Sequence, residues 1–158
     1  MLHRSSSPIF GPEHDQFRDG VRRFLATEFT PRIEAFEADG KVSRELWLRA
    51  GEMGFLCPTL LEEYGGLGLD FSYNTVLNEE YSYAMMPDCL TLQTDITLPY
   101  LLHYGSVDQK RHYLPRMASG ETITAIAMTE PDAGSDLQSI RTTARRDGDD
   151  FVINGSKT

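Results

Sequence analysis

The sequence predicts a mainly α-helical fold that is followed by the first antiparallel strands of a β domain. Apolar residues recur at helical spacing through most of the chain, which indicates helices with one buried face. After Glu121 the pattern changes to β-branched and alternating residues, and Asp147-Gly148 and Asn154-Gly155 are hairpin dipeptides. We therefore expect an N-terminal helical domain over residues 1–121 and the start of a β domain over residues 122–158.

Composition and charge limit the classes of function. The chain has 158 residues, 40% of them hydrophobic, which is enough for one domain and part of a second. Its formal net charge of -9 repels phosphate backbones, so we expect no nucleic-acid partner. No membrane span or secretory signal is recognisable, which favours the cytoplasm, or the mitochondrial matrix if the source is a eukaryote. Cys57 and Cys89 lack the spacing of a metal or redox pair, and we expect both in the core.

Three helices are expected in the first third of the chain. The segment from Pro12 to Phe29 has one apolar face with charges opposite. A shorter helix is expected from Pro31 to Asp39, with Gly40 as its stop. Ser43 is placed to cap a third helix. The inward residues of this third helix are expected to be Leu46, Trp47, Ala50 and Met53.

Three further helices are expected before the pattern changes. Residues 62–68 break the helical periodicity and predict an ordered loop, whose glycines match no phosphate-binding motif. The next helix carries its apolar face on Tyr73, Val76, Leu77, Tyr81 and Ala84. The apolar run from Leu90 to Leu102 contains Pro99, which should bend or end that helix. Ser106 is expected to cap a last amphipathic helix, and Gly120 to end it.

The strand signals lie after this last helix. Ile123–Thr129 is rich in β-branched residues, and Ile140–Arg146 alternates with the period of a strand. Asn-Gly is the strongest two-residue hairpin signal, so a partner strand is expected after Asn154-Gly155. Only three residues follow that dipeptide. We therefore expect the β domain to be truncated.

The segment Ala127–Asp136 carries the polar groups most suited to chemistry. Hydroxyls, carboxylates and exposed backbone gather where a strand runs into a loop, which predicts a polar ligand-binding loop. Its carboxylates, Glu130, Asp132 and Asp136, are candidates for acid/base work or for a divalent metal. We favour the simpler interpretation that Glu130 and Asp136 cap amides of the loop and that Asp132 faces water. No metal site is assigned.

This segment resembles the signature of the acyl-CoA dehydrogenase family, in which Thr-Glu-Pro leads into Ala-Gly-Ser-Asp. Essentially the whole chain is similar to that family, in order and at family spacing. The other matching segments are 62–68, 105–110, 113–115, 119–121, 140–144 and 154–158. The residues from Ile126 to Pro131, together with the Gly-Ser-Lys-Thr ending, look most like the long-chain branch.

The resemblance implies an FAD cofactor and an acyl-CoA substrate that is oxidised to the trans-2-enoyl-CoA in fatty-acid β-oxidation. It implies that backbone groups of Ile126 and Met128 and the hydroxyl of Thr129 meet the pyrimidine side of the flavin. Fixed donors there stabilise the charge of the reduced flavin. The implied cofactor-binding residues are Ile126, Ala127, Met128, Thr129, Gly134 and Ser135. Ser135 is also expected to contact the CoA portion of the substrate.

The family's glutamate base belongs to a C-terminal helical bundle, so no catalytic residue is assigned here and the 158 residues alone are expected to be inactive. The resemblance also implies an electron-transfer flavoprotein as acceptor and a homo-oligomer for the full-length protein. The acyl tail is expected between the helices of Tyr73–Ala84 and Leu90–Leu102, where Ile96, Thr97 and Pro99 widen a channel. An ordinary kinked core helix remains an equal alternative.

Two other interpretations stay open. The chain is compatible with a non-catalytic ligand-binding or interaction module built on the helical domain. It is also compatible with an acyl-CoA oxidase-type relative, in which oxygen reoxidises the flavin. Local motifs do not separate an oxidase from a dehydrogenase, because the closed cavity of the whole protein governs access of oxygen.

Overall fold

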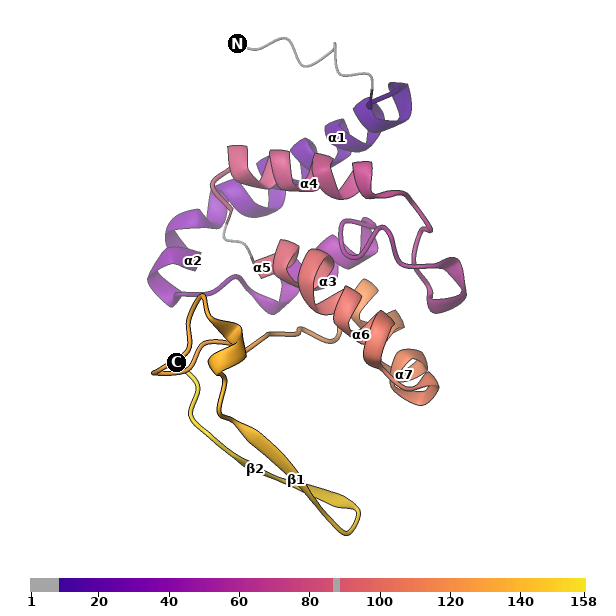
Figure 1. Ribbon diagram of the computed structural model, residues 1–158. Helices are drawn as coiled ribbons and strands as arrows, with labels where there is room; N and C mark the ends of the chain where they lie inside the picture. Colours follow the sequence, from indigo (N-terminus) through magenta and orange to yellow (C-terminus); the bar gives the residue numbers. More distant parts are fainter. Residues whose placement is uncertain (1–8, 87–88) are drawn as a thin grey trace. The chain divides into compact units, whose positions relative to one another are not determined.

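The computed structural model describes residues 9–86 and 89–158 and divides into two compact units (Figure 1). The first unit ends at Thr124, and the second runs from Ala125 to Thr158. Helices form the first unit, and a two-stranded antiparallel sheet lies in the second. The predicted fold class, a helical domain followed by the first antiparallel strands of a β domain, is confirmed.

A continuous helical path opens the first unit (Figure 1). Its segments are α1 (Pro12–Phe24), the π-helical η2 (Leu25–Phe29), the 3-10 turn η3 (Thr30–Arg32) and α2 (Ile33–Asp39). Pro12 begins the path because its missing N–H would have no partner in a first turn. Gly40 ends the path with a φ of +65°, as predicted, since glycine takes this left-handed conformation without a steric penalty.

The third helix, α3 (Arg44–Glu52), begins where the sequence predicts. Ser43 caps it, because its hydroxyl accepts a hydrogen bond from the Leu46 N–H at 3.3 Å. The predicted inward residues Leu46, Trp47 and Ala50 are buried. Met53 was expected to be inward and is 42% exposed. The prediction is wrong at Met53 because the helix ends at Glu52, so the helical spacing no longer fixes the direction of the next side chain.

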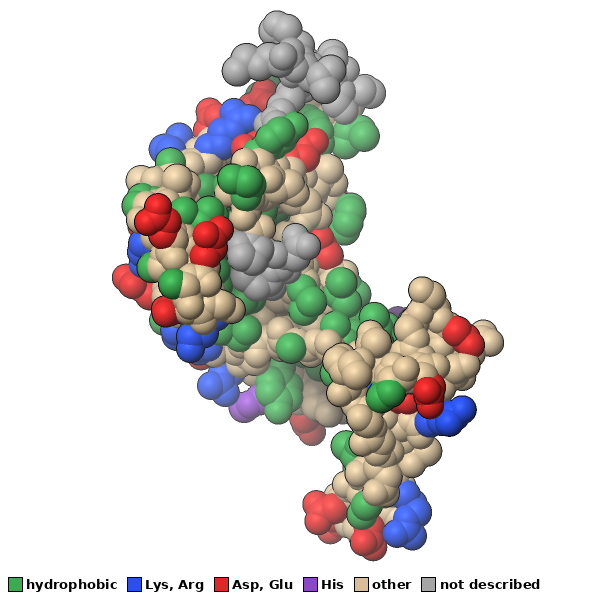
Figure 2. All heavy atoms as spheres, turned by 90° about the vertical axis from the view of Figure 1, so that its left-hand side faces the viewer, with side chains coloured by type: hydrophobic (Ala, Val, Ile, Leu, Met, Phe, Trp, Pro, Cys, Tyr) green, Lys and Arg blue, Asp and Glu red, His purple; other side chains and the backbone are tan. Residues whose placement is uncertain are grey.

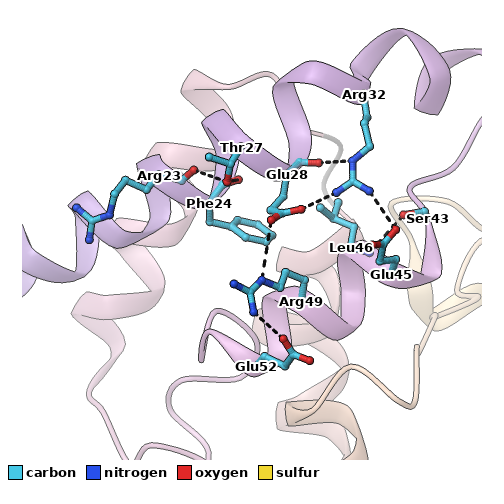
Figure 3. Close-up of polar contacts among 10 residues, drawn as sticks. All are labelled: Arg23, Phe24, Thr27, Glu28, Arg32, Ser43, Glu45, Leu46, Arg49 and Glu52. Atoms are coloured by element: carbon cyan, nitrogen blue, oxygen red, sulfur yellow. Dashed lines mark hydrogen bonds and ion pairs between the residues drawn. The ribbon is translucent and has the colours of Figure 1, made fainter.

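Surface ion pairs join the first helical path to α3 (Figure 3). The Arg32 guanidinium lies 2.9 Å from the Glu28 carboxylate and 3.2 Å from that of Glu45. Arg49 lies 4.0 Å from Glu28 and 2.7 Å from Glu52. Such exposed pairs contribute about 0–1 kcal/mol each, so the buried face of α3 stabilises the packing more than these charges do.

An ordered loop and a fourth helix follow. The loop contains the 3-10 turn η4 (Glu62–Tyr64) and leads to α4 (Phe71–Tyr83). A Cβ on Gly66 would lie 2.0 Å from the Leu60 carbonyl oxygen, so only glycine fits there. The loop is thus held by close backbone packing, as the prediction of an ordered loop requires.

Helices α1 and α4 lie side by side (Figure 1). A charged cluster joins them. Arg18 and Glu80 are buried, and the Arg18 guanidinium donates to Glu80 at 2.7 Å. Arg22 Nε donates to the other oxygen of Glu80 at 2.8 Å. Burial acts to raise the pKa of Glu80, but the hydrogen bonds from Arg22 and Arg18 outweigh it and leave that pKa below its ordinary value. The cluster fixes how the two helices meet.

The predicted break at Pro99 is a change of helix type. Three segments follow one another here: α5 (Cys89–Thr91), the π-helical η5 (Leu92–Thr97) and α6 (Leu98–Tyr104). Pro99 lies in the first turn of α6, directly after the π-helical segment, at a position where a helix tolerates a residue without an N–H. The wider π turn ends just before it. The winding therefore changes at Pro99 and the helix does not stop there.

The last helix of the unit, α7 (Val107–Ala118), has the predicted signals at both ends. Ser106 and Gln109 form a reciprocal capping box, with N···O distances of 2.8 and 3.2 Å. Gly120 follows the helix with a φ of +78°. A Cβ on Gly120 would lie 2.3 Å from the Trp47 carbonyl oxygen, so this glycine also permits close contact with α3.

The core of the first unit gathers one face of each long helix. Its largest fully buried hydrophobic side chains are those of Phe29, Leu46, Leu60, Leu77, Leu90, Leu98, Leu114 and Met117. Cys57 is fully buried, as predicted, whereas the side chain of Cys89 lies outside the described part. Within the described ranges, no helix has the length and apolar character needed to cross a membrane. Some apolar side chains do reach the surface of this unit (Figure 2).

The second unit contains one hairpin (Figure 1). Strands β1 (Thr143–Asp147) and β2 (Asp150–Asn154) pair antiparallel, with Asp147 opposite Asp150. Gly148 has a φ of +63° in the two-residue turn, which confirms the hairpin predicted from Asp147-Gly148. The strand predicted to begin at Ile140 begins three residues later, after the 3-10 turn η6 (Leu137–Ser139).

Two strand predictions are wrong. Residues 123–129 pair with no other strand in the described part of the chain, because β propensity favours an extended backbone but cannot supply a neighbour. Asn154-Gly155 is not a hairpin turn, since Gly155 does not have a positive φ. A Cβ on Gly155 would lie 2.0 Å from the Thr142 hydroxyl. Glycine is therefore required there for close approach of two segments.

Candidate functional site

The six predicted site residues lie on the two arms of one tight turn in the second unit. The turn is closed between Glu130 and Ala133 by a pair of backbone hydrogen bonds of 2.9 and 3.1 Å. One arm before the turn contains Ile126, Ala127, Met128 and Thr129, and the other arm begins with Gly134 and Ser135. All six are exposed except Ile126, which is half-buried. Five of the six predicted site residues are thus open to solvent on the two arms of the turn.

The turn is anchored by the carboxylate of Glu130, which is only 7% exposed. One of its oxygens accepts the Arg141 N–H at 2.7 Å, and the other accepts the Thr142 N–H at 3.0 Å. The Lys157 ammonium lies 3.0 Å from the same carboxylate. These groups tie the turn to the residues just before β1 and just after β2. They also explain the late start of β1, because the carboxylate occupies the N–H groups of Arg141 and Thr142.

Glu130 is held in its charged form. The Thr142 side chain, the Arg141 amide and the Lys157 ammonium lower the pKa of Glu130 to about 2, against an ordinary value of 4.5. A general base at neutral pH needs a pKa near 7 and a lone pair free for the incoming proton. Glu130 has neither, so its role in the site is to hold the turn.

The other two carboxylates of the loop have separate, local partners. Asp132 is exposed and forms an ion pair with Arg141 at 3.5 Å. Asp136 accepts a hydrogen bond from the hydroxyl of Ser139 and binds no amide of the loop. Glu130 likewise caps amides outside the loop, so the prediction that these two side chains cap the loop's own amides is wrong. Across the described ranges, no group of three His, Cys, Asp or Glu side chains could hold a metal ion.

Sequence reasoning missed the part played by Lys157. Its ammonium donates to the Met128 carbonyl oxygen at 3.1 Å besides pairing with Glu130. The following residue, Thr158, donates its N–H to the Thr129 carbonyl oxygen at 3.0 Å. No local pattern links residues so far apart along the chain. The only available signal was the acidic residue Glu130 itself, because a carboxylate that is buried in a turn needs a cation as its partner.

Several donors on the first arm remain available to a ligand. The N–H groups of Met128 and Thr129 and the Thr129 hydroxyl make no hydrogen bond to any residue that the structure describes. Their carbonyl oxygens, by contrast, are both bound by the segment after β2. Exposed donors on a fixed backbone suit a planar ligand with carbonyl oxygens along one edge.

The first unit has separate hollows near its π-helical segment. One of about 380 Å³ lies between α4 and η5, and its polar lining includes Asn78 and Asp95. The Asn78 amide donates to Asp95 at 2.7 Å. Ile96 also lines this hollow. Pro99 lines a second hollow of about 540 Å³ along α6.

Comparison with known proteins places both units in one family. The acyl-CoA dehydrogenase N-terminal domain model matches residues 11–121, and the acyl-CoA dehydrogenase middle domain model matches residues 125–158. The long-chain specific acyl-CoA dehydrogenase of Sus scrofa mitochondria is 46% identical over 153 residues, which are 94% of this chain and 35% of that protein.

Solved structures agree with this result. The crystal structure of an acyl-CoA dehydrogenase from Geobacillus kaustophilus has a TM-score of 0.92 and 45% identity, over 97% of this chain and 40% of that one. A glutaryl-CoA dehydrogenase from Mycobacterium smegmatis, in complex with FADH2, has a TM-score of 0.87 and 29% identity, over 96% of this chain and 40% of that one. The chain thus spans well under half the length of these relatives. It belongs to the acyl-CoA dehydrogenase family.

Proposed function

We propose that this chain supplies the helical domain and one side of the flavin site of an FAD-dependent acyl-CoA dehydrogenase. The helical domain is assigned to residues 1–121 and the start of the middle β domain to residues 122–158. The observation that carries the proposal is the set of unpaired donors at Met128 and Thr129, on a backbone whose carbonyl oxygens are already bound. The alternative function, a ligand-binding module without catalysis, is not favoured by any specific observation.

The residues of the turn fit the edge of a flavin. FAD bound at this turn would supply the acceptor for a hydride from the acyl β-carbon. The N–H of Met128 and the hydroxyl of Thr129 would donate to carbonyl groups on the pyrimidine side, where negative charge grows on reduction. Ile126 and Ala127 would continue this arm beside the ring. Gly134 and Ser135 form the second arm, and the Ser135 hydroxyl would donate toward the flavin and the CoA portion of the substrate.

The proposed substrate is a long-chain acyl-CoA, oxidised to the trans-2-enoyl-CoA in fatty-acid β-oxidation. Its support is the identity to the long-chain specific relative. The acyl tail is assigned to the space between α4 and the η5–α6 path. The proposed acceptor is an electron-transfer flavoprotein, and the proposed assembly of the whole protein is a homo-oligomer. A mitochondrial matrix location is proposed if the source is a eukaryote, and the cytoplasm otherwise.

No residue of this chain is proposed as the base that removes the α proton. Glu130 is the only buried carboxylate of the turn, and its low pKa and its three bound partners exclude it from that role. The chain's part in the reaction is to bind the flavin edge and to orient it. The base is assigned to sequence outside these 158 residues.

The test is an anaerobic titration of the purified protein that carries this chain, followed by visible flavin absorption. We expect palmitoyl-CoA to bleach the flavin at lower concentrations than octanoyl-CoA or isovaleryl-CoA does. Admission of air then distinguishes a dehydrogenase from an acyl-CoA oxidase, because rapid reoxidation of the flavin by oxygen would indicate an oxidase. Retained flavin that no acyl-CoA bleaches would contradict a dehydrogenase. Bleaching by the 158 residues alone would contradict the assignment of the base.

A further inference from the structure

The segment after β2 binds the backbone on both sides of Thr129. The Lys157 ammonium donates to the Met128 carbonyl oxygen at 3.1 Å, and the Thr158 N–H donates to the Thr129 carbonyl oxygen at 3.0 Å. These two bonds fall on consecutive peptide groups. Lys157 is in turn held by Glu130, whose side chain is 6% exposed.

Two fixed peptide planes determine the direction of the Cα–Cβ bond of the residue between them, and the hydroxyl of Thr129 then occupies one of the few staggered positions about that bond. A peptide group is planar, so the carbonyl of Met128 and the N–H of Thr129 lie in one plane and point opposite ways. Binding that carbonyl therefore aims the Thr129 N–H away from Lys157. The next plane is held at both ends, because the Thr129 carbonyl accepts from Thr158 and the Glu130 N–H donates to Ala133 at 2.9 Å. Little backbone freedom is left at Thr129.

We propose that Lys157, held by Glu130, is a positioning residue that aims the N–H and hydroxyl of Thr129 at the flavin. The inference rests on the proposed function, because it concerns the same edge of the cofactor. In this role Lys157 acts through the backbone, by its bond to the Met128 carbonyl oxygen. The ion pair with Glu130 fixes the position of the Lys157 ammonium. Glu130 is itself held by the N–H groups of Arg141 and Thr142, so its carboxylate cannot move with the lysine.

Charge balance supports the same role. Glu130 stays ionised in the turn, so it places a negative charge close to the backbone that meets the flavin. The Lys157 ammonium offsets that charge at 3.0 Å. Removal of the ammonium would leave the carboxylate without its cation, and a nearby uncompensated negative charge disfavours a reduced flavin. The variant should therefore have a lower flavin reduction potential as well as weaker binding.

The experiment compares three variants of the purified full-length protein. Lys157→Met removes the hydrogen bond to the Met128 carbonyl oxygen and the ion pair with Glu130. Lys157→Arg keeps the positive charge. Arg141→Met is the matched control, because it removes an exposed cation that pairs with Asp132 of the same turn and leaves the Arg141 backbone N–H on Glu130. The readouts are the FAD dissociation constant, the flavin reduction potential and the thermal unfolding temperature of the apoprotein.

We expect Lys157→Met to weaken FAD binding by roughly tenfold, which is the effect of losing one well-aimed hydrogen bond to the cofactor. We also expect this variant to have a lower flavin reduction potential. Lys157→Arg should recover most of the potential, and Arg141→Met should match the wild type in both. An unchanged potential and unchanged affinity in Lys157→Met would overturn the positioning role. A fall in the unfolding temperature alone would also overturn it, because that result describes a structural contact.

Two further outcomes are distinguishable. If Lys157→Met gives no folded protein, Glu130→Gln carries the same test, because its amide oxygen still accepts one of the two backbone N–H groups and the neutral side chain no longer holds the lysine by charge. Glu130→Gln should also weaken FAD binding, but it should raise the reduction potential, because it removes the negative charge and leaves the lysine cation. Wild-type values of both would overturn the proposal. A wild-type protein that binds no FAD would overturn the proposed function, and the positioning role with it. A wild type that binds FAD tests the role of Lys157 alone.

Discussion

At the scale of single residues, Glu130 connects the sequence motif to the structure of the turn. Its pKa of about 2 lies below the ordinary value of 4.5, so its ionised form is stabilised by folding. The stabilisation is complete above pH 4.5 and is lost as the pH falls through about 2. We therefore expect the amide proton shifts of Arg141 and Thr142 to titrate with a midpoint near 2 in an NMR titration of the protein.

The control for this titration is Glu130→Gln, in which the same two amide shifts should stay constant over that pH range. A wild-type midpoint near 4.5 would show that the carboxylate is not held by the groups around it. Movement of the shifts in the Gln variant would show that another acid controls them. Either result would contradict the arrangement of Glu130 described above.

Cys57 gives a second prediction at this scale. Burial raises the pKa of its thiol to about 12. Because the thiolate is the reactive form, iodoacetamide at pH 8 should leave Cys57 unmodified in the folded protein and alkylate it in urea. Peptide mapping by mass spectrometry measures each cysteine separately. Rapid native alkylation at Cys57 would mean that the loop around it opens far more readily than its complete burial indicates.

The site could be predicted from sequence at the residue scale only in part. The polar turn and its exposed arm follow from residues that are adjacent in the chain. Lys157 was not predicted, because its partners Met128 and Glu130 are separated from it by the whole hairpin. The capping role assigned to Asp136 was also wrong, since its side chain accepts a hydrogen bond from the nearby Ser139 hydroxyl and not from an amide of the loop. Local spacing identifies the polar groups but not their partners.

At the scale of elements, two glycines allow the cost of backbone conformation to be separated from that of packing. Gly40 and Gly120 both have positive φ, but a Cβ on Gly40 would meet nothing within 4 Å. A Cβ on Gly120 would overlap the backbone of Trp47. We expect Gly40→Ala to lower the free energy of unfolding by about 1–2 kcal/mol through backbone strain. Gly120→Ala should cost about 1–3 kcal/mol more through overpacking.

Urea denaturation of the two variants and the wild type checks this difference. If Gly40→Ala and Gly120→Ala lowered the free energy of unfolding equally, α3 would have to move away from the end of α7 and make room for the new methyl group without an energetic cost. The prediction depends on the contact between these helices, because the positive φ is common to both sites. The comparison therefore tests how tightly the end of α7 is packed.

The elements that the sequence predicts correctly have signals at their own ends. Ser43, Ser106 and Gly40 act on N–H or carbonyl groups within a few residues, so their effect is visible in the sequence. The π-helical segment before Pro99 has no such signal. Residues 123–129 failed as a strand for a different reason, because a strand needs a partner and the sequence of one segment does not contain it.

At the scale of the whole molecule, the two units differ in how much of each is buried. The first unit has a core that draws on every long helix, whereas every residue of β1 and β2 is exposed. A two-stranded hairpin with no buried face is marginally stable in water. Arg145 and Arg146 lie on β1. In the 158-residue chain, we therefore expect trypsin to cut first at these arginines.

The matched sites are Arg111 and Arg116, which have exposed side chains on α7. Trypsin needs a locally unfolded backbone, and α7 is held by the buried Leu114 and Met117, so these sites should resist cleavage. A time course followed by mass spectrometry should show loss of the hairpin while the fragment that contains α1 to α7 persists. Simultaneous cleavage at Arg111 would mean that the helical unit does not hold together by itself, and the independent core inferred for it would be wrong.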